Sequence, residues 1–196
     1  MKKLFAFLLA LVMTCSAFAV AFAADVSGYD AHATINLEPF KSDFYAGAFD
    51  DMSYTAQIQS SKSIKIDLGG ANEYLEIRPR IDMITRSGIE NFNPYLSIST
   101  NSKYARGIYI KIGENRYLAT IQDESIQIGS GLFAILEEIA TTSLPVQIAV
   151  TGRTRIVYTL TEADLSLIIN FADALRTSGL ADQLPDDEVI IITKYN

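Results

Sequence analysis

The feature that most constrains the fold is a stretch of strict alternation between apolar and charged residues in the middle of the chain. The apolar positions are Leu75, Ile77, Pro79, Ile81 and Met83, and the charged positions between them are Glu76, Arg78, Arg80 and Asp82. Successive side chains of a β-strand point to opposite faces, so this pattern predicts a strand with one buried and one polar face. Pro79 has no N–H to donate, which predicts that this strand lies at a sheet edge or is bulged there.

The same period of two recurs elsewhere, and two segments have helical spacing instead. Further strands are expected near residues 54–59, 64–68, 94–99, 108–112, 117–121, 146–150, 156–160 and 188–193. The last of these is apolar on both faces, which is typical of a central or covered strand. One helix is expected at 130–141. A second begins after Thr161, where Asp164 completes a capping box, and ends at Gly179, which suits a left-handed C-terminal cap.

These elements predict an α+β fold. We expect one domain over residues 24–196, in which about eight to ten strands of mostly antiparallel sheet pack against two amphipathic helices. The layout of the last ninety or so residues resembles invasion-associated locus B-type secreted bacterial proteins, which also place a short helix between two strand pairs and a second helix after them. The paired cysteines of that family are absent from this chain, so the resemblance implies no function and no site residue.

Residues 1–23 have the three parts of a secretory signal peptide. Lys2 and Lys3 form a basic start, residues 4–13 are an apolar run, and Ala21 and Ala23 place small side chains at the −3 and −1 positions of a cleavage site. We therefore predict a bacterial protein that is secreted or periplasmic, with cleavage after Ala23.

Three alternatives to this cleavage remain open. Cleavage after Ala19 would also leave small residues at the required positions, and Cys15 lies in a weak lipoprotein-like sequence that would be acylated. Residues 4–23 are long enough to span a bilayer if the segment stays uncut as an anchor. After cleavage at Ala23, the remaining 173 residues carry a net charge of −9, no cysteine and no expected transmembrane segment.

Composition and motifs argue against several classes of function. A net charge of −7 over the whole chain disfavours nucleic acid as a partner, because nucleic acid rewards a basic surface. One cysteine and one histidine provide neither a disulfide nor a typical zinc site, and no fingerprint for a phosphate, calcium ion or cofactor is present. His32 is the one histidine available to a nucleophilic triad, and no Gly-x-Ser-x-Gly motif accompanies it.

Acidic pairs offer the other route to catalysis. They occur at Asp50-Asp51, Asp123-Glu124, Glu137-Glu138 and Asp186-Asp187-Glu188. Residues adjacent in sequence point apart on strands and helices, whereas a glycoside hydrolase needs two acids that face each other. We interpret these residues as ordinary solvated acids and expect no catalytic residue, no metal site and no cofactor.

Candidate contact residues come from three surface features. The charged row Glu76, Arg78, Arg80 and Asp82 suits either a solubilising ladder or an arginine pair for an anionic ligand or partner. Predicted hairpin tips carry Arg116, Arg153 and Arg155, and predicted polar faces carry Tyr95 and Tyr109. Tyrosine on such a face suits stacking against a sugar, a protein interface or an ordinary antiparallel sheet with one solvent-exposed face.

We expect a non-enzymatic protein that binds an unidentified protein or envelope component. The alternative is a binding protein for a small anionic, sugar or lipid ligand, with the Arg78 and Arg80 face or the aromatics of residues 40–49 at its site. Those aromatics equally suit a plug at one end of the core. A hydrolase built on converging carboxylates ranks third.

Overall fold

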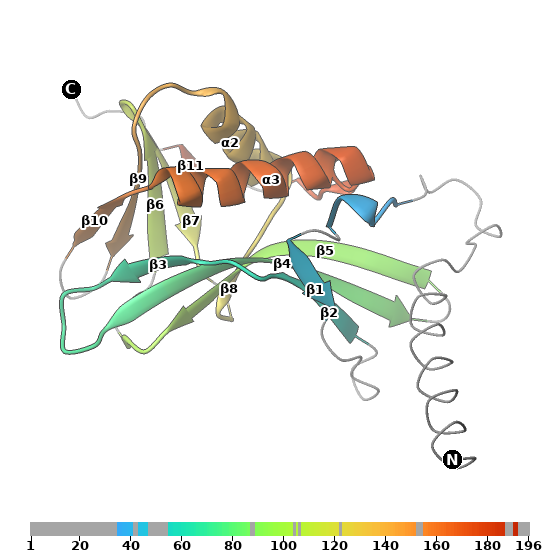
Figure 1. Ribbon diagram of the computed structural model, residues 1–196, viewed down its shortest axis with the longest axis horizontal. Helices are drawn as coiled ribbons and strands as arrows, with labels where there is room; N and C mark the ends of the chain where they lie inside the picture. Colours follow the sequence, from blue (N-terminus) through green and yellow to red (C-terminus); the bar gives the residue numbers. More distant parts are fainter. Residues whose placement is uncertain are drawn as a thin grey trace, which may run out of the picture.

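The computed structural model consists of two antiparallel β-sheets with two α-helices in the angle between them (Figure 1). It describes residues 35–40, 43–46, 55–86, 89–103, 105, 107–121, 123–151, 155–186 and 190–191. The predicted signal peptide, Cys15, His32 and Arg153 lie outside these residues. No helix in the described ranges is long and apolar enough to cross a membrane.

The first sheet has six strands and is built on a long hairpin. β4 (Tyr74–Arg86) pairs with β5 (Ile89–Thr100) from Leu75 opposite Thr100 to Arg86 opposite Ile89. β2 (Thr55–Ser60) and β3 (Ile64–Asp67) follow each other along the other side of β4. β1 (Phe44–Ala46) extends the sheet beyond β2, and β8 (Ser125–Gln127) extends it beyond β5.

The second sheet has five strands in the order β10-β9-β6-β7-β11. Their bounds are β6 Gly107–Ile112, β7 Asn115–Thr120, β9 Val146–Thr151, β10 Ile156–Thr159 and β11 Ile190–Ile191. The last strand, which was predicted to be central or covered, is not central, because β11 pairs with β7 at one end of this order. The described chain has eleven strands, more than expected, because β1 and β8 have three residues each and are too short to show alternation.

The two helices begin and end at the residues that the sequence indicates. α2 spans Ser130–Thr141 and α3 spans Glu162–Ser178, with short 3-10 turns η1 (Glu38–Phe40) and η2 (Ala181–Gln183) beside them. Thr161 Oγ1 accepts from the Asp164 N–H at 3.2 Å, and Asp164 Oδ2 accepts from the Thr161 N–H at 2.9 Å. Gly179 has a φ of 82°, so the predicted capping box and left-handed cap are both confirmed.

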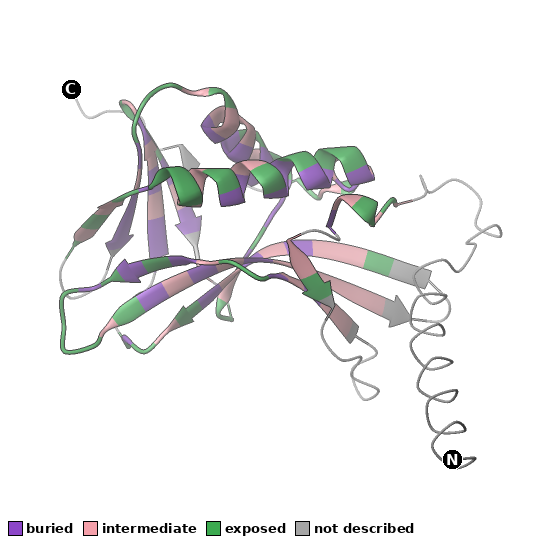
Figure 2. Cartoon of the chain, in the orientation of Figure 1, coloured by how far each residue is buried: buried purple, intermediate pink, exposed green. Residues whose placement is uncertain are grey.

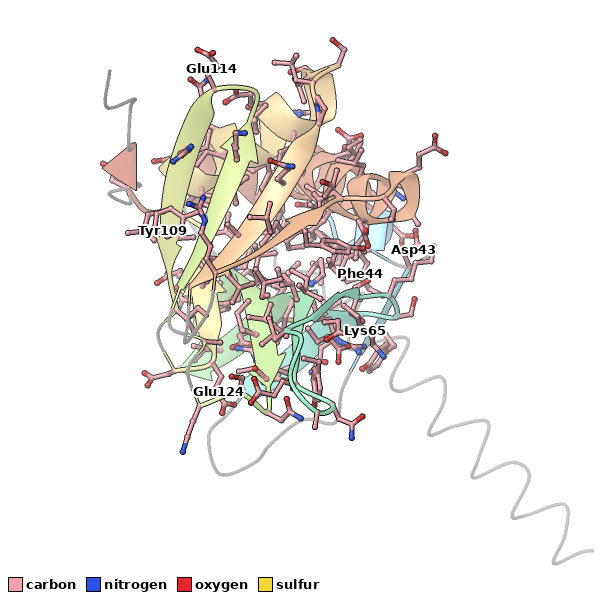
Figure 3. The ribbon with its side chains drawn as sticks, turned by 90° about the vertical axis from the view of Figure 1, so that its left-hand side faces the viewer. Asp43, Phe44, Lys65, Tyr109, Glu114 and Glu124 are labelled. Carbon is pink, nitrogen blue, oxygen red and sulfur yellow. The ribbon has the colours of Figure 1, made fainter. Side chains whose placement is uncertain are left out.

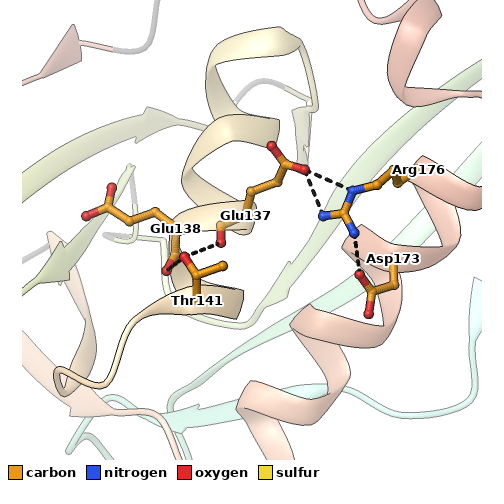
Figure 4. Close-up of polar contacts among 5 residues, drawn as sticks. All are labelled: Glu137, Glu138, Thr141, Asp173 and Arg176. Atoms are coloured by element: carbon orange, nitrogen blue, oxygen red, sulfur yellow. Dashed lines mark hydrogen bonds and ion pairs between the residues drawn. The ribbon is translucent and has the colours of Figure 1, made fainter.

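A surface ion-pair cluster connects the two helices (Figure 4). The Arg176 guanidinium donates to Glu137 Oε1 on α2 through Nη2 at 2.7 Å and Nε at 3.1 Å. Its Nη1 donates to Asp173 Oδ1, one turn earlier on α3, at 2.8 Å. All three side chains are about half exposed, so solvent screens the cluster and packing supplies most of the helix contact.

The core lies where the inner faces of both sheets meet the helices (Figure 2). A cavity of about 20 Å³ there is lined by Ile77 and Leu96 of the first sheet, Ile110 of the second, Leu136 of α2 and Ile168 of α3, among others. Its lining is wholly apolar, and its volume is too small for an organic ligand.

The predicted aromatic segment closes one end of this core. Phe40 is 2% exposed, and its ring centroid lies 5.3 Å from that of Phe44 and 6.4 Å from that of Phe171 on α3. The ring centroids of Phe44 and Phe171 lie 5.7 Å apart. These three rings fit the interpretation of the segment as a plug; Phe49 is outside the described residues.

Pro79 lies inside the first sheet, so of the two predicted alternatives, an edge position or a bulge, the edge position was wrong. The backbone of Leu96, its partner on β5, faces β8, because Ile128 N donates to Pro94 O and Ile98 N donates to Glu124 O. The Pro79 nitrogen therefore faces β2 and β3, and that neighbour is interrupted between Ser60 and Ile64.

Pro79 leaves the Ser60 carbonyl without a ladder donor, since the register that pairs Gln59 with Arg80 places Ser60 opposite Pro79, which has no N–H. Arg78 Nη1 donates to this carbonyl at 3.1 Å instead. Ser60 is 0% exposed, so the arginine satisfies a buried acceptor. A break in the neighbouring strand together with a side-chain donor thus accommodates proline in an interior strand.

Candidate functional site

The predicted contact residues fall on two separate surfaces, the outer faces of the two sheets. Five of them, Glu76, Arg78, Arg80, Asp82 and Tyr95, belong to β4 and β5 of the first sheet. Three others, Tyr109, Arg116 and Arg155, belong to the second sheet or its flank. The structure therefore divides the predicted set into two groups that do not share a site.

The charged residues in the row on the first sheet form ion pairs with one another. Arg78 Nη2 lies 2.5 Å from Glu76 Oε1, and Arg80 Nη2 donates to Asp82 Oδ2 at 3.1 Å. Arg80 Nε lies 2.9 Å from Asp82 Oδ1 but is not aligned with it as a hydrogen bond. Between 16% and 29% of each of these four side chains is exposed. Each arginine is thus neutralised by an acid two residues away on the same face.

Burial and hydrogen bonding shape the protonation of this row. Burial raises the pKa of Asp82, although the Arg80 charge opposes the shift. Burial, and then the Asp82 charge, raise the pKa of Tyr95, whose ring centroid lies 5.3 Å from the Arg80 guanidinium carbon. The pKa of Glu76 is lowered, first by a hydrogen bond from Ser63 and also by Arg78. The row is a compensated polar network, which favours the ladder interpretation over an open site for anions.

The outer face of the second sheet has a hollow of about 320 Å³. It is lined by Tyr109, Lys111, Arg116, Gln147, Ala149, Arg155 and Val157, and we call it the cationic hollow. Figure 3 is turned toward this sheet, with Tyr109 beside its strands and Glu114 at the β6–β7 turn. Lys111, Arg116 and Arg155 give its lining three cations and no carboxylate.

The strand register explains why this face is concave. Val157, Ala149 and Tyr109 lie side by side on β10, β9 and β6. The alanine methyl group lies between two larger side chains, so the face is lowest at Ala149 and rises on either side of it. Val157 is 51% exposed and forms one wall.

The next row of side chains holds the polar groups in place. Gln147 Nε2 donates to Thr159 Oγ1 at 3.2 Å, and Lys111 Nζ approaches Gln147 Oε1 at 3.5 Å. Arg116 lies directly opposite Lys111 on β7. Like charges directly opposite each other destabilise a sheet, and a bound anion would remove that repulsion.

The cations of the hollow differ from those of the first sheet in their partners. Among the described residues, no ion pair involves Lys111, Arg116 or Arg155. Arg116 and Arg155 are exposed, and Lys111 is partly exposed beside a neutral amide. Within the described part of the chain, no acid neutralises these three positive charges, whereas Glu76 and Asp82 neutralise Arg78 and Arg80.

Sequence reasoning identified part of this site and missed the rest. Tyr109, Arg116 and Arg155 were predicted contact residues, whereas Lys111, Gln147, Ala149 and Val157 were not. The alternation places Tyr109 and Lys111 on one polar face, but no sequence signal shows that β9 pairs with β6 and brings Ala149 beside Tyr109. Arg153, the remaining predicted residue, lies outside the described residues.

Comparisons of the chain with protein-family models, with curated proteins and with solved structures found no match. The chemistry of the cationic hollow is therefore the basis for a functional assignment. Its lining contains no carboxylate, cysteine, histidine or serine, which are the usual nucleophiles and bases of hydrolytic sites.

Proposed function

We propose that this protein is a non-enzymatic binding protein of the secreted or periplasmic space, and that it takes an anionic ligand in the cationic hollow. One observation carries the proposal: three cations that form no ion pair with any described residue line one concavity of a chain whose net charge is −7. The export half of the proposal rests on the signal-peptide pattern of residues 1–23.

The contrast between the two sheets supports binding at the second. Arginine pairs bidentately with carboxylate and phosphate groups, and on the first sheet Arg80 already has such a partner in Asp82. Arg116 and Arg155 have none in the described structure. An anion that enters the hollow gains these contacts without first breaking any ion pair that the described residues form.

Exposure sets the expected strength of binding. Exposed ion pairs contribute about 0.2–1 kcal/mol each, and hydrogen bonds to charged groups contribute about 1.5–3 kcal/mol where water is excluded. The hollow lies between these limits, so we expect modest affinity that weakens as salt rises.

The test is isothermal titration of the purified protein with three polyanions of different chemistry: polyglutamate, polyphosphate and an oligogalacturonate. We expect at least one to bind and Arg116→Ala or Arg155→Ala to weaken it about fivefold to tenfold. The control is Lys62→Ala, which removes one positive charge at an exposed position away from the hollow. Absence of binding by all three, or equal weakening by the control, would refute the proposed function.

A variant that fills the hollow provides a second test without a change of charge. Ala149 is 3% exposed at the floor of the hollow, and Ala149→Leu would extend its side chain into that space. We expect this variant to lose binding while its far-ultraviolet circular dichroism is unchanged. Binding at the wild-type level by folded Ala149→Leu protein would place the anion elsewhere.

A further inference from the structure

We infer that the ligand class of the cationic hollow is an acidic oligosaccharide, whose carboxylates reach the cations at two corners while an uncharged ring face lies over the centre. This inference rests on the proposed function and makes it more specific. Three properties of the hollow carry it: its concavity, its uncharged centre and the placement of its cations at opposite corners.

Concavity favours a discrete ligand over a lipid surface. A volume of about 320 Å³ is at the lower end of the range for small-molecule sites, which is about 300–1,000 Å³. A bilayer surface instead rewards apolar side chains that project beyond their surroundings. Ala149, at the floor, is recessed between Val157 and Tyr109 and would stay out of reach of such a surface.

The centre of the hollow suits a neutral ring with hydroxyl groups. The Tyr109 side chain provides an aromatic face and a phenol, while Ala149 and Val157 provide an apolar floor and wall. The Gln147 amide is held by Thr159 and Lys111, so its direction is fixed before a ligand arrives. A purely ionic ligand such as polyphosphate would make little use of these neutral groups.

The cations come from opposite corners of this centre. Arg155 flanks β10 and Arg116 is on β7, three strand spacings or about 14 Å apart across the sheet. The strand register places Arg155, through its neighbour on β9, level with Gly107 of β6. It places Arg116 directly opposite Lys111 of β6. That four-residue step adds about 13 Å along the strands, so the two backbone positions are about 20 Å apart.

Both arginines nevertheless line the same hollow, so their side chains reach inward from the two corners. An acid group bound at one corner leaves the cation at the other corner for a second acid group. A chain of acidic sugars matches this arrangement, with one acid at Arg155, a neutral ring face on Tyr109 and another acid at Arg116 and Lys111.

The experiment compares trigalacturonate with four matched probes by isothermal titration of the full protein. The probes are its methyl ester, which masks the carboxylates, galacturonate monomer, polyglutamate, and vesicles of phosphatidylglycerol. We expect trigalacturonate to bind at least about tenfold more tightly than the ester, the monomer or polyglutamate. Tyr109→Ala should weaken trigalacturonate binding about fivefold to tenfold, with little change for polyglutamate, while Tyr109→Phe should retain most of it.

Failure of this inference is distinguishable from failure of the proposed function. Polyglutamate or the vesicles could bind as tightly as trigalacturonate, with binding that Arg116→Ala weakens. That result would support the anion site and refute the assignment of an acidic oligosaccharide. The same conclusion follows if Tyr109→Ala leaves trigalacturonate binding unchanged. If Arg116→Ala and Arg155→Ala affect no anion that binds, both proposals fall together.

Discussion

Replacing Arg78 by alanine tests how the first sheet tolerates a proline in an interior strand. Arg78 Nη1 donates at 3.1 Å to the Ser60 carbonyl, which lies opposite Pro79 and has no backbone donor there. Arg78→Ala removes that donor. Pro79→Ala restores a backbone N–H at the position that faces the same carbonyl. The double variant should therefore recover part of what Arg78→Ala loses.

The magnitude follows from the burial of the acceptor. Ser60 is 0% exposed, and an orphaned buried acceptor costs about 1–3 kcal/mol. We expect Arg78→Ala to lower the free energy of unfolding by about 2 kcal/mol when residue 79 is proline. When residue 79 is alanine, Arg78→Ala should lower the free energy of unfolding by less, with a difference of about 1 kcal/mol or more, because the new N–H at position 79 donates to the Ser60 carbonyl. Pro79→Ala alone should cost about 0.4–1 kcal/mol through the greater freedom of the unfolded chain.

The assay is equilibrium urea unfolding of the four proteins, followed by circular dichroism and tyrosine fluorescence because the chain has no tryptophan. Glu76→Gln serves as a control, since it removes the ion pair with Arg78 and leaves the donor to Ser60 in place. Equal costs of Arg78→Ala in the two backgrounds would refute the reasoning. A cost of Glu76→Gln as large as that of Arg78→Ala would also refute it, because the ion pair alone would then explain the loss.

Three further predictions concern a cap, a titration and a turn. Thr161→Ala removes the hydroxyl of the α3 capping box and should lower the free energy of unfolding in urea by about 1–2 kcal/mol; no change would show that the cap is dispensable. The pKa of Glu76 is lowered in the folded state, so its carboxylate stabilises the fold fully above the ordinary pKa of 4.5, and this stabilisation is lost as pH falls through the folded-state pKa. Plots of unfolding free energy against pH for Glu76→Gln and the wild type should therefore converge in acid. Plots that stay parallel would contradict this prediction. Gly113 has a φ of 57°, and an added Cβ would lie 2.7 Å from Leu144 Cδ1. Gly113→Ala should therefore lower the free energy of unfolding in urea by about 1–2 kcal/mol. An unchanged unfolding midpoint would contradict this prediction.

Local chemistry made much of the fold predictable from sequence. The alternation from Leu75 to Met83 predicted β4, and its apolar residues from Leu75 to Ile81 are buried in the structure. The bounds of α2 and the caps of α3 also follow from residues close in the chain, because capping and helical periodicity act over a few residues. Period-two alternation likewise separated the polar Tyr109 face of β6 from its buried face.

The sequence did not predict strands that lack a local pattern or positions that depend on distant partners. β8 has three residues and follows a turn in which Asp123 and Glu124 both have positive φ, so alternation gives no signal there. The interior position of Pro79 depends on a break in β2 and β3 and on a donor from Arg78. Neither is visible in the alternation of β4 itself.

The sequence by itself determined the α+β class, the faces of the main strands, the helix ends and the likeness of residues 1–23 to a signal peptide. Tertiary structure alone decided that the predicted contact residues separate onto two sheets and that Arg116 and Arg155 share one hollow. The physical reason is that a period of two fixes which way a side chain points but not which strand lies beside it. Pairing and register depend on how the apolar faces of all the strands pack together, and that packing placed Ala149 beside Tyr109.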